Sequence, residues 1–271
     1  MRPETSSFLA PVRRALSNRA LVRALVRREL TARYRGGALG FLWSLVNPLL
    51  LLLVYATVFR FVFAPRADVR PYALFLFGGV LVWNFVAASL NDAVETFRAN
   101  GPLLRKTTVA PEVFPAASVG ARLAHLILAL PVLAAAIAYA AAKGSARPGP
   151  VLLEFPLVLA LLALTVFGGA LAVSALSVHF GDVRDIVANL LTLAFFVTPV
   201  LYPAEAVPER FRRLLLANPF APFFNGVHDT LFAFRPVSAA DWAAMIAWTA
   251  VSLVVGGALF EKLRDSLAEE A

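Results

Sequence analysis

The stretch VRALVRRELTARYRGG at residues 22–37, followed by ALGFLWSLVNPLLLLLVYATVF at residues 38–59, decides the fold of this chain. Tyr55 carries the only ionisable side chain between residues 36 and 59. About 20 apolar residues are enough for a helix to cross a hydrocarbon core of roughly 30 Å. The sequence therefore predicts a basic surface segment that leads directly into a membrane span.

The basic residues predict the orientation of that span. Nine arginines precede residue 36, and an excess of basic residues favours the cytoplasmic side. With six spans and both termini inside, 16 of the 25 lysines and arginines fall on the inner side. The sequence therefore predicts a multi-pass protein of the cytoplasmic (inner) membrane with both termini in the cytoplasm.

The composition excludes several other classes of protein. Of the 271 residues, 60% are hydrophobic and 15% are charged, which is more apolar than soluble domains are. The net charge of +8 does not indicate a nucleic-acid partner, because the arginines lie beside apolar runs, where anionic membrane lipids are the simpler partner. Without cysteine there is no disulfide, thiolate metal site or cysteine nucleophile.

Six hydrophobic segments predict an all-α integral membrane domain over residues 36–260. Residues 1–35 are expected to form a cytoplasmic tail and interfacial helix, and 261–271 a charged cytoplasmic tail. The apolar run within 205–241 is too short and too often broken by proline to span, and predicts short re-entrant or gate helices on the outer side. The expected spans are about 36–63, 71–92, 117–142, 151–178, 186–204 and 242–260.

Proline and glycine predict where the helices break. Asn47-Pro48 and Thr198-Pro199 predict interruptions in the first and fifth spans, because proline lacks a backbone donor and disfavours helical geometry before it. The sequence NGP at 100–102 predicts the end of the helix that continues the second span. The segment that follows is either a plain connector or a docking element for a soluble partner.

The N-terminal region predicts an amphipathic helix on the cytoplasmic membrane surface, from Leu21 to Leu30, after a mobile basic tail. Glu29 interrupts its apolar side, and Arg33, four residues later, can neutralise that charge. The alternative is a basic flank that only sets the topology.

Motifs for catalysis are missing from the sequence. Lys106 is the only lysine followed by Ser or Thr, and it lacks the glycines of a phosphate-binding loop. Three scattered histidines do not predict a metal site. We therefore expect a permease without catalytic residues of its own.

Several ordered motifs are spread over nearly the whole chain. They are LVRREL and RYRGGALGFLWSLVNPL at the first span, NGPLLRK and PEVFP after the second, LSVHFGDVRDI before the fifth, FFVTPVLYP within it, LLLANPFAPFFNGVHDTLF after it, and a charged FEKL tail. In these motifs the chain resembles the permease subunits of type-2 ABC exporters of polysaccharides, which export O-antigen, teichoic acid or capsule. It departs from them at Val109-Ala110-Pro111, where an aromatic-Pro-Arg is usual, and at Gly181, where an arginine is usual.

The resemblance implies two copies of this chain, each resting on a separate ATP-binding cassette subunit that binds ATP and Mg²⁺. The chain itself would carry no cofactor, metal or catalytic residue. The charged inner loop before the fifth span comprises Asp182, Arg184 and Asp185. The side chains expected to couple the permease to the ATPase are Arg27, Arg28, Glu29, Arg33, Arg98, Arg105 and Lys106.

The resemblance also implies a conduit between the two permeases, lined largely by the first and fifth spans, that carries a lipid-linked glycan outward. The aromatic residues expected to stack on sugar rings are Trp43, Tyr55, Phe59, Phe195, Phe196 and Tyr202. The alternative for these residues is an interfacial aromatic belt. The expected helix breaks and outer gate involve Pro48, Pro199, Pro203, Asn218 and Pro219.

Two other functions remain open at this stage. One is a type-2 ABC permease for a drug or lipid, and the other is a membrane-embedded enzyme that modifies glycans. Activity in liposomes without ATP or any partner would support the enzyme, and accumulation of cytoplasmic glycan after depletion would argue against the drug or lipid permease.

Overall fold

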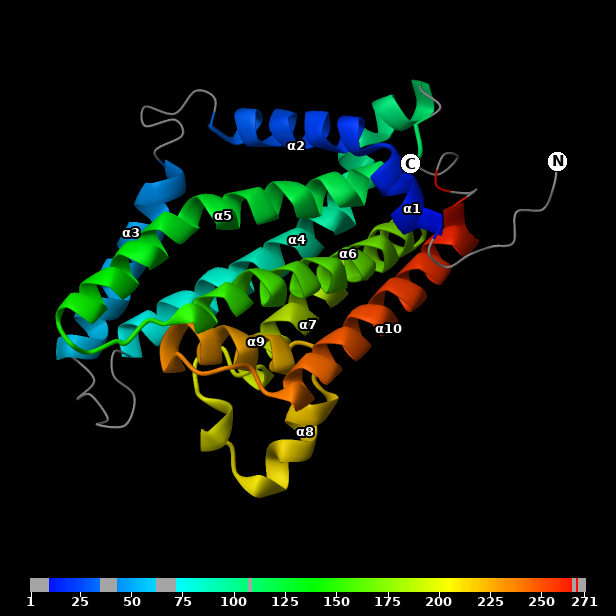
Figure 1. The fold of residues 1–271 in the computed structure, drawn as a ribbon. Helices are drawn as coiled ribbons and strands as arrows, with labels where there is room; N and C mark the ends of the chain where they lie inside the picture. The colour runs from blue at the N-terminus through cyan, green and yellow to red at the C-terminus, as the bar shows by residue number, and fades with distance from the viewer. Residues whose placement is uncertain (1–9, 35–42, 62–71, 107–108, 265–266, 268–271) are drawn as a thin grey trace.

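The fold is a bundle of long helices (Figure 1), seen in a computed structural model that describes residues 10–34, 43–61, 72–106, 109–264 and 267. Within these ranges the chain forms helices and turns and no β-strand, which confirms the prediction of an all-α protein. Four helical stretches are long and apolar enough to cross a membrane. They are Tyr72–Gly101 within α4 (Tyr72–Lys106), α5 (Val113–Ala142), Pro150–His179, which joins η2 (Pro150–Glu154) to α6 (Phe155–His179), and α10 (Ala239–Leu263).

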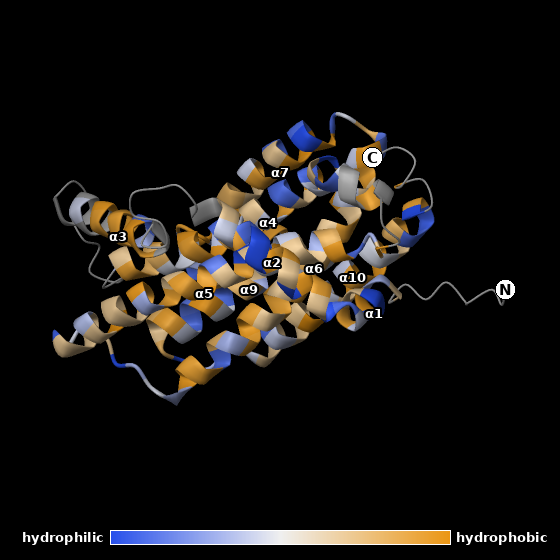
Figure 2. Cartoon of the chain, turned by 90° about the horizontal axis from the view of Figure 1, so that it is seen from above, coloured by the Kyte–Doolittle hydropathy of each residue, from blue (hydrophilic) through white to orange (hydrophobic). Residues whose placement is uncertain are grey.

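Two further helices match the first and fifth predicted spans but are shorter. The helix α3 (Trp43–Phe61) has 19 residues, and α7 (Val183–Val197) has 15. At about 1.5 Å per residue, α7 is roughly 22 Å long, less than the hydrocarbon core. Hydrophobic residues predominate along the bundle helices (Figure 2). Crossing of the membrane by α3 and α7 therefore stays a prediction.

The expected helix end at residues 100–102 is wrong, because α4 continues through Asn100, Gly101 and Pro102 to Lys106. The side-chain amide of Asn100 donates to the carbonyl of Thr96 at 2.9 Å and accepts from Arg28 Nη2 at 2.6 Å. The bond to Thr96 lies within α4, and the bond from Arg28 ties α4 to α2. Tertiary contacts of this kind override weak local propensity.

The helix α3 also continues through Pro48, where the sequence predicts a break. Pro48 is the sixth residue of α3, so only the first turn lies before it. Proline here removes one intrahelical hydrogen bond, the one that the N–H of residue 48 would donate to the carbonyl of residue 44, and the helix continues on both sides of it.

The N-terminal region holds two helices, α1 (Ala10–Ser17) and α2 (Arg19–Tyr34). The prediction of a mobile basic tail over residues 1–19 is therefore wrong for residues 10–19, which the structure describes. The helix α2 lies beside α5 (Figure 1). Its apolar side packs there, because a Cβ on Gly120 of α5 would come within 2.9 Å of Val26 Cγ2. We call the end of the bundle with α1, the start of α2 and the last turns of α4 and α10 the basic end.

The helices α6 and α10 pack tightly against each other. A Cβ on Gly256 would lie 1.9 Å from the carbonyl oxygen of Gly168. Ser252 Oγ donates to the carbonyl of Thr165 at 2.7 Å, and the hydroxyls of Thr165 and Thr249 lie 2.8 Å apart. Small residues and hydroxyl groups at a helix interface are typical of membrane bundles.

At the opposite end, which we call the loop end, residues 198–238 form short helices between α7 and α10. They are η3 (Ala204–Ala206), η4 (Glu209–Phe211), α8 (Arg212–Ala217), α9 (Ala221–His228) and the π-helix η5 (Asp229–Ala233). The segment packs on α4 at Gly79, where a Cβ would lie 2.6 Å from the carbonyl oxygen of Val200. Phe234 follows η5 with φ of 50°, a left-handed conformation that lets the chain reverse direction.

Candidate functional site

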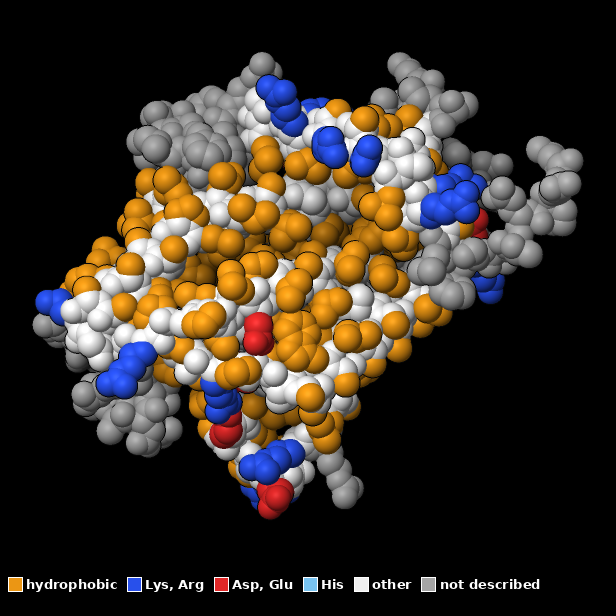
Figure 3. Space-filling view, viewed as in Figure 1, with side chains coloured by type: hydrophobic (Ala, Val, Ile, Leu, Met, Phe, Trp, Pro, Cys, Tyr) orange, Lys and Arg blue, Asp and Glu red, His pale blue; other side chains and the backbone are white. Residues whose placement is uncertain are grey.

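At the basic end, α2 and α4 meet through Arg28 and Asn100, while Arg27 and Arg98 are exposed. Glu29 lines a cavity of about 340 Å³ between α2, α4 and α5. Basic side chains lie over α2 on the face in Figure 3. The side chains of Arg33, Arg105 and Lys106 lie outside the described part of the chain. The described coupling residues thus gather at one end of the bundle, where a soluble partner can reach the exposed arginines.

The predicted inner loop also lies at the basic end. Asp182 occupies the N-cap position of α7 without a side-chain capping bond, and Asp185 lies in the first turn, where a negative charge is favoured by the helix dipole. Arg184 pairs with Glu95 of α4 at 3.5 Å. The loop is therefore tied to the same helix that bears Arg98.

Sequence reasoning missed a cluster of charges around the buried Glu112 at the basic end. Arg14 of α1 bonds both Glu112, at the start of α5, and Glu261 of α10. Arg264 Nε lies 4.0 Å from the second carboxylate oxygen of Glu112. The Glu112 side chain is fully buried. Three elements far apart in sequence therefore share one charge cluster. In the sequence, the only signal for this cluster was that Glu112 belongs to the PEVFP motif.

A second missed feature is a row of polar side chains on α4. Asn84 and Asn91 lie seven residues apart on one face of α4 and are exposed, although both lie inside a candidate span. With Asn47, Arg122 and His125 they line a cavity of about 580 Å³ between α3, α4 and α5. Arg122 holds Asp92 with two hydrogen bonds. Polar side chains at membrane depth usually face water or protein. The seven-residue spacing of Asn84 and Asn91 was the sequence signal that could have indicated a polar face on this helix.

The predicted conduit aromatics are only partly described. Phe195 packs against Trp83 of α4 with ring centroids 5.8 Å apart, whereas Phe196 is 63% exposed. The Tyr202 hydroxyl donates to the carbonyls of Phe196 and Val197 at 3.0 and 2.9 Å. Of the six residues, Phe196 is the one described ring that is mostly exposed. The side chains of Trp43, Tyr55 and Phe59 lie outside the described part of the chain.

The predicted gate prolines flank turns at the loop end. The helix α7 ends at Val197, immediately before Thr198 and Pro199. The side-chain amide of Asn218 donates to Thr198 Oγ1 at 2.9 Å, and its oxygen accepts from the backbone N–H of Phe220 at 2.9 Å across Pro219. Thr198 is fully buried. This buried amide therefore fixes the two proline turns against each other.

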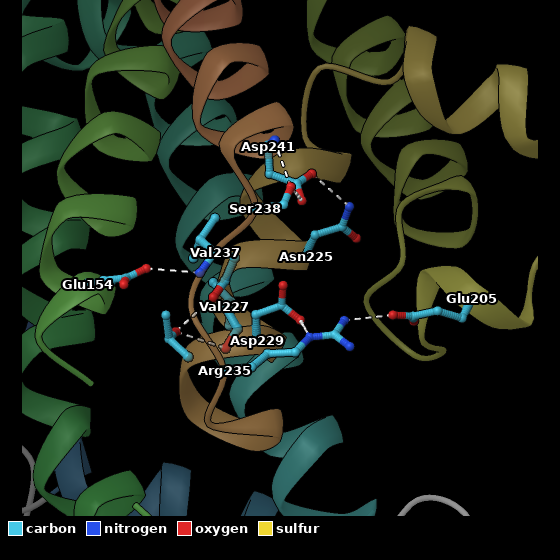
Figure 4. Close-up of polar contacts among 11 residues, drawn as sticks. Glu154, Glu205, Asn225, Val227, Asp229, Arg235, Val237, Ser238 and Asp241 are labelled. Atoms are coloured by element: carbon cyan, nitrogen blue, oxygen red, sulfur yellow. Dashed lines mark hydrogen bonds and ion pairs between the residues drawn. The ribbon is translucent and has the colours of Figure 1, made fainter. Parts of the chain in front are cut away.

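Arg235 joins two carboxylates at the loop end (Figure 4). Its Nε donates to Asp229 Oδ1 at 2.7 Å, and its Nη2 donates to Glu205 Oε1 at 2.7 Å. The bond from Arg235 lowers the pKa of Glu205, while burial raises the pKa of Asp229 against the opposing effect of Arg235. Next to this triad, Glu154 accepts from the backbone N–H of Val237 at 3.0 Å. Together these bonds fix the chain between η5 and α10.

We expect the Glu205–Arg235 pair to stabilise the fold only while Glu205 is ionised. The usual pKa of 4.5 is lowered in the folded chain, so the stabilisation is present above the unfolded value and is lost as the pH falls through the folded one. Both side chains are more than half exposed, and the contribution is therefore below about 1 kcal/mol. The measurement is the difference in melting temperature between wild type and Glu205→Gln, which should shrink as the pH falls below 4.5.

The control for this prediction is Glu209→Gln, because the Glu209 side chain is 89% exposed and lies 3.8 Å from Arg212. It should melt like the wild type throughout. A Glu205→Gln difference that stays constant down to acid pH would contradict the assignment.

Comparison of the sequence with known proteins shows the family of this chain. The sequence profile described as ABC-2 type transporter matches residues 20–232. The chain belongs to the ABC-2 type transporter family. This ABC-2 chain is 34% identical over 260 residues to the O-antigen export system permease protein RfbA of Myxococcus xanthus, covering 95% of this chain and 98% of the relative. The family and the apolar helices together make it a multi-pass membrane protein and a transporter component.

Two more distant relatives extend the comparison of the ABC-2 chain. The O-antigen export system permease protein RfbA of Klebsiella pneumoniae is 28% identical over 250 residues, covering 92% of this chain and 94% of the relative. The polysialic acid transport protein KpsM of Escherichia coli is 22% identical over 247 residues, covering 91% and 94%. The resemblance inferred from the motifs is confirmed by these matches.

Proposed function

We propose that this chain is the membrane-spanning subunit of an ATP-driven exporter that moves a lipid-linked polysaccharide across the cytoplasmic membrane. The observation that carries the proposal is the 34% identity to an O-antigen export permease over nearly the full length of both chains. The cargo is an O-antigen, teichoic acid or capsule-like glycan.

The working complex in this proposal contains two copies of the chain and two ATP-binding cassette subunits. ATP and Mg²⁺ bind to those partner subunits, because this sequence has no phosphate-binding loop. Family membership implies such an ATP-binding partner. The basic end lies in the cytoplasm, supported by the nine arginines before residue 36.

The geometry suggests how force passes through the permease. The exposed Arg27 and Arg98 meet the ATPase, and the Arg28–Asn100 bond joins α2 to α4. A displacement of this end of α4 is then transmitted along the bundle, because α4 is one continuous helix of 35 residues. The faces of α3, α4 and α7 line the conduit, and the segment 198–238 forms the outer gate.

The test is export in a reconstituted system. The chain is coexpressed with an ATP-binding cassette subunit of the same organism, purified in mild detergent and placed in liposomes that contain the lipid-linked glycan of the host. We expect ATP-dependent appearance of glycan on the opposite leaflet, detected by a lectin, and none with a partner that cannot hydrolyse ATP. Failure to recover any ATPase with the chain, or glycan modification without ATP, would contradict the proposal.

A further inference from the structure

The loop end contains a cavity of about 700 Å³, enclosed by the start of α4, the turn at 203–205, α8, and the region from α9 to η5. This volume lies within the range of pockets that hold small ligands. Its floor is the His228 ring, which stacks on Phe75 of α4 with centroids 3.7 Å apart. Arg235 and the residues it bonds form one side (Figure 4). The cavity thus lies between the segment 198–238 and the starts of α4 and α10.

Hydrogen-bond acceptors with unused capacity line the cavity. Arg235 bonds one oxygen of Asp229 and one of Glu205. Because an ionised carboxylate has about four acceptor sites, both carboxylates keep acceptor capacity for a ligand. The Asn225 amide donates to Asp241 Oδ1 at 3.1 Å, which leaves the Asn225 oxygen as a third acceptor. A ligand that fits these groups must donate hydrogen bonds.

The charges around the cavity disfavour an anionic ligand. Glu205, Asp229 and Asp241 carry three negative charges against the positive charges of Arg212 and Arg235. Burial lowers the pKa of His228 to about 3, so its ring is neutral at physiological pH. Among the described residues no three His, Asp or Glu side chains are placed to hold a metal ion. The lining charges, three negative and two positive, leave a net of one negative charge, which favours a neutral ligand over a phosphate or a uronic acid.

Part of the cavity lining is apolar, formed by Leu215 and Leu216 of α8 and Phe232 of η5. A sugar ring has hydroxyl groups along its rim and C–H groups on its faces, so it matches a cavity that offers both acceptors and apolar side chains. A simple amine would satisfy the acceptors but leave the apolar side chains without a partner.

We propose that this cavity binds one neutral sugar unit of a glycan, held by hydroxyl donation to Asp229, Glu205 and Asn225. The identity of the natural ligand rests on the proposed function, in which the loop end faces outward. The cavity then holds a glycan unit beside the outer gate as the polymer leaves the conduit.

The test measures binding of methyl glycosides to the complete transporter in lipid nanodiscs without ATP, by saturation-transfer NMR. The probes are the methyl glycosides of glucose, galactose, mannose and rhamnose, with ethanolamine and glucuronate as cationic and anionic probes. At least one neutral glycoside should bind. Loss of one hydrogen bond, worth about 1 kcal/mol, should weaken that binding about fivefold in Glu205→Gln and in Asn225→Ala.

The matched control is Glu209→Gln, which lies in the same segment but does not line the cavity. It should bind like the wild type. The proposal is overturned if no neutral glycoside binds, if ethanolamine or glucuronate binds instead, or if Glu209→Gln weakens binding as much as Glu205→Gln. Asn225→Ala keeps the test valid if Glu205→Gln fails to fold, since the Asn225 bond to Asp241 is separate from the Arg235 bonds.

Failure of this site can be told apart from failure of the proposed function. If ATP-dependent glycan export is observed but no glycoside binds to the nanodiscs, only the sugar site is wrong. If glycosides bind with the expected mutant pattern but no glycan is exported, the site stands and the function of the chain must be sought elsewhere.

Discussion

Replacing Arg14 with alanine is expected to destabilise the folded chain by about 3–5 kcal/mol, because it leaves a buried carboxylate without its main partner. The Glu112 side chain is fully buried, and Arg14 is the residue that bonds it. Arg264 Nε lies 4.0 Å from Glu112, too far for a hydrogen bond. Arg14 also bonds Glu261 of α10, so α1 would lose both of its ion pairs. The measurement is the melting temperature of the purified transporter in detergent.

The control for Arg14 is Arg13→Ala, which removes the same charge from the neighbouring exposed position. It should melt close to the wild type. Combining Arg14→Ala with Glu112→Gln should recover part of the loss, because the stranded charge is then removed and neighbouring sites are not additive. If Arg14→Ala melts like Arg13→Ala, the charge cluster contributes no stability.

Gly256→Leu is expected to disrupt the packing of α6 against α10. Even a Cβ at this position would lie 1.9 Å from the carbonyl oxygen of Gly168, and a Cβ on Gly168 would lie 2.5 Å from the backbone of Ser252. These neighbours are backbone atoms, so a rotamer change cannot relieve the clash. Overpacked sites cost about 1–3 kcal/mol when the surroundings can shift, and here the helices would have to separate. We expect a large loss of monodisperse protein in size-exclusion chromatography after detergent extraction.

The control for Gly256 is Gly149→Leu, because a Cβ on Gly149 meets nothing within 4 Å. It should give the yield and elution profile of the wild type. Gly256→Ala should fall between the two variants, since it adds the clash of one methyl group only. Normal yield of Gly256→Leu would show that α6 and α10 do not pack as closely as described.

The four long spans were predictable from hydrophobicity and length, because each contains a long and predominantly apolar run that a membrane can bury. The ends of these helices were not predictable. Local residues indicated a helix end at Asn100, yet α4 continues to Lys106. Arg28 of α2, which is far from Asn100 in sequence but adjacent in the fold, bonds the Asn100 side chain. Likewise α1 forms where a mobile tail was expected, because Arg14 finds carboxylates on two other helices.

Some features of the candidate site were also predictable from the sequence, and others depend on tertiary contacts. The exposed arginines of α2 and α4 follow from the basic motifs, and the turn at Pro199 follows from proline itself. Arg184 pairs with Glu95 of α4, and Arg235 pairs with Glu205, 30 residues away, and with Asp229, six residues away. No spacing rule indicates these partners. The polar row of Asn84 and Asn91 was visible as a seven-residue repeat, but its cavity depends on α3 and α5.

The sequence by itself determined an all-helical membrane protein, its family and its basic N-terminal region, because hydrophobicity, charge bias and ordered motifs are properties of contiguous residues. The tertiary structure alone decided which charges are buried together and where cavities form. Glu112 is only one carboxylate in a motif until α1 brings Arg14 to it, and Glu205, Asn225 and Asp229 share a cavity only because α8 and η5 fold back beside α4. Burial and pairing energies depend on distances through space, which the order of residues does not contain.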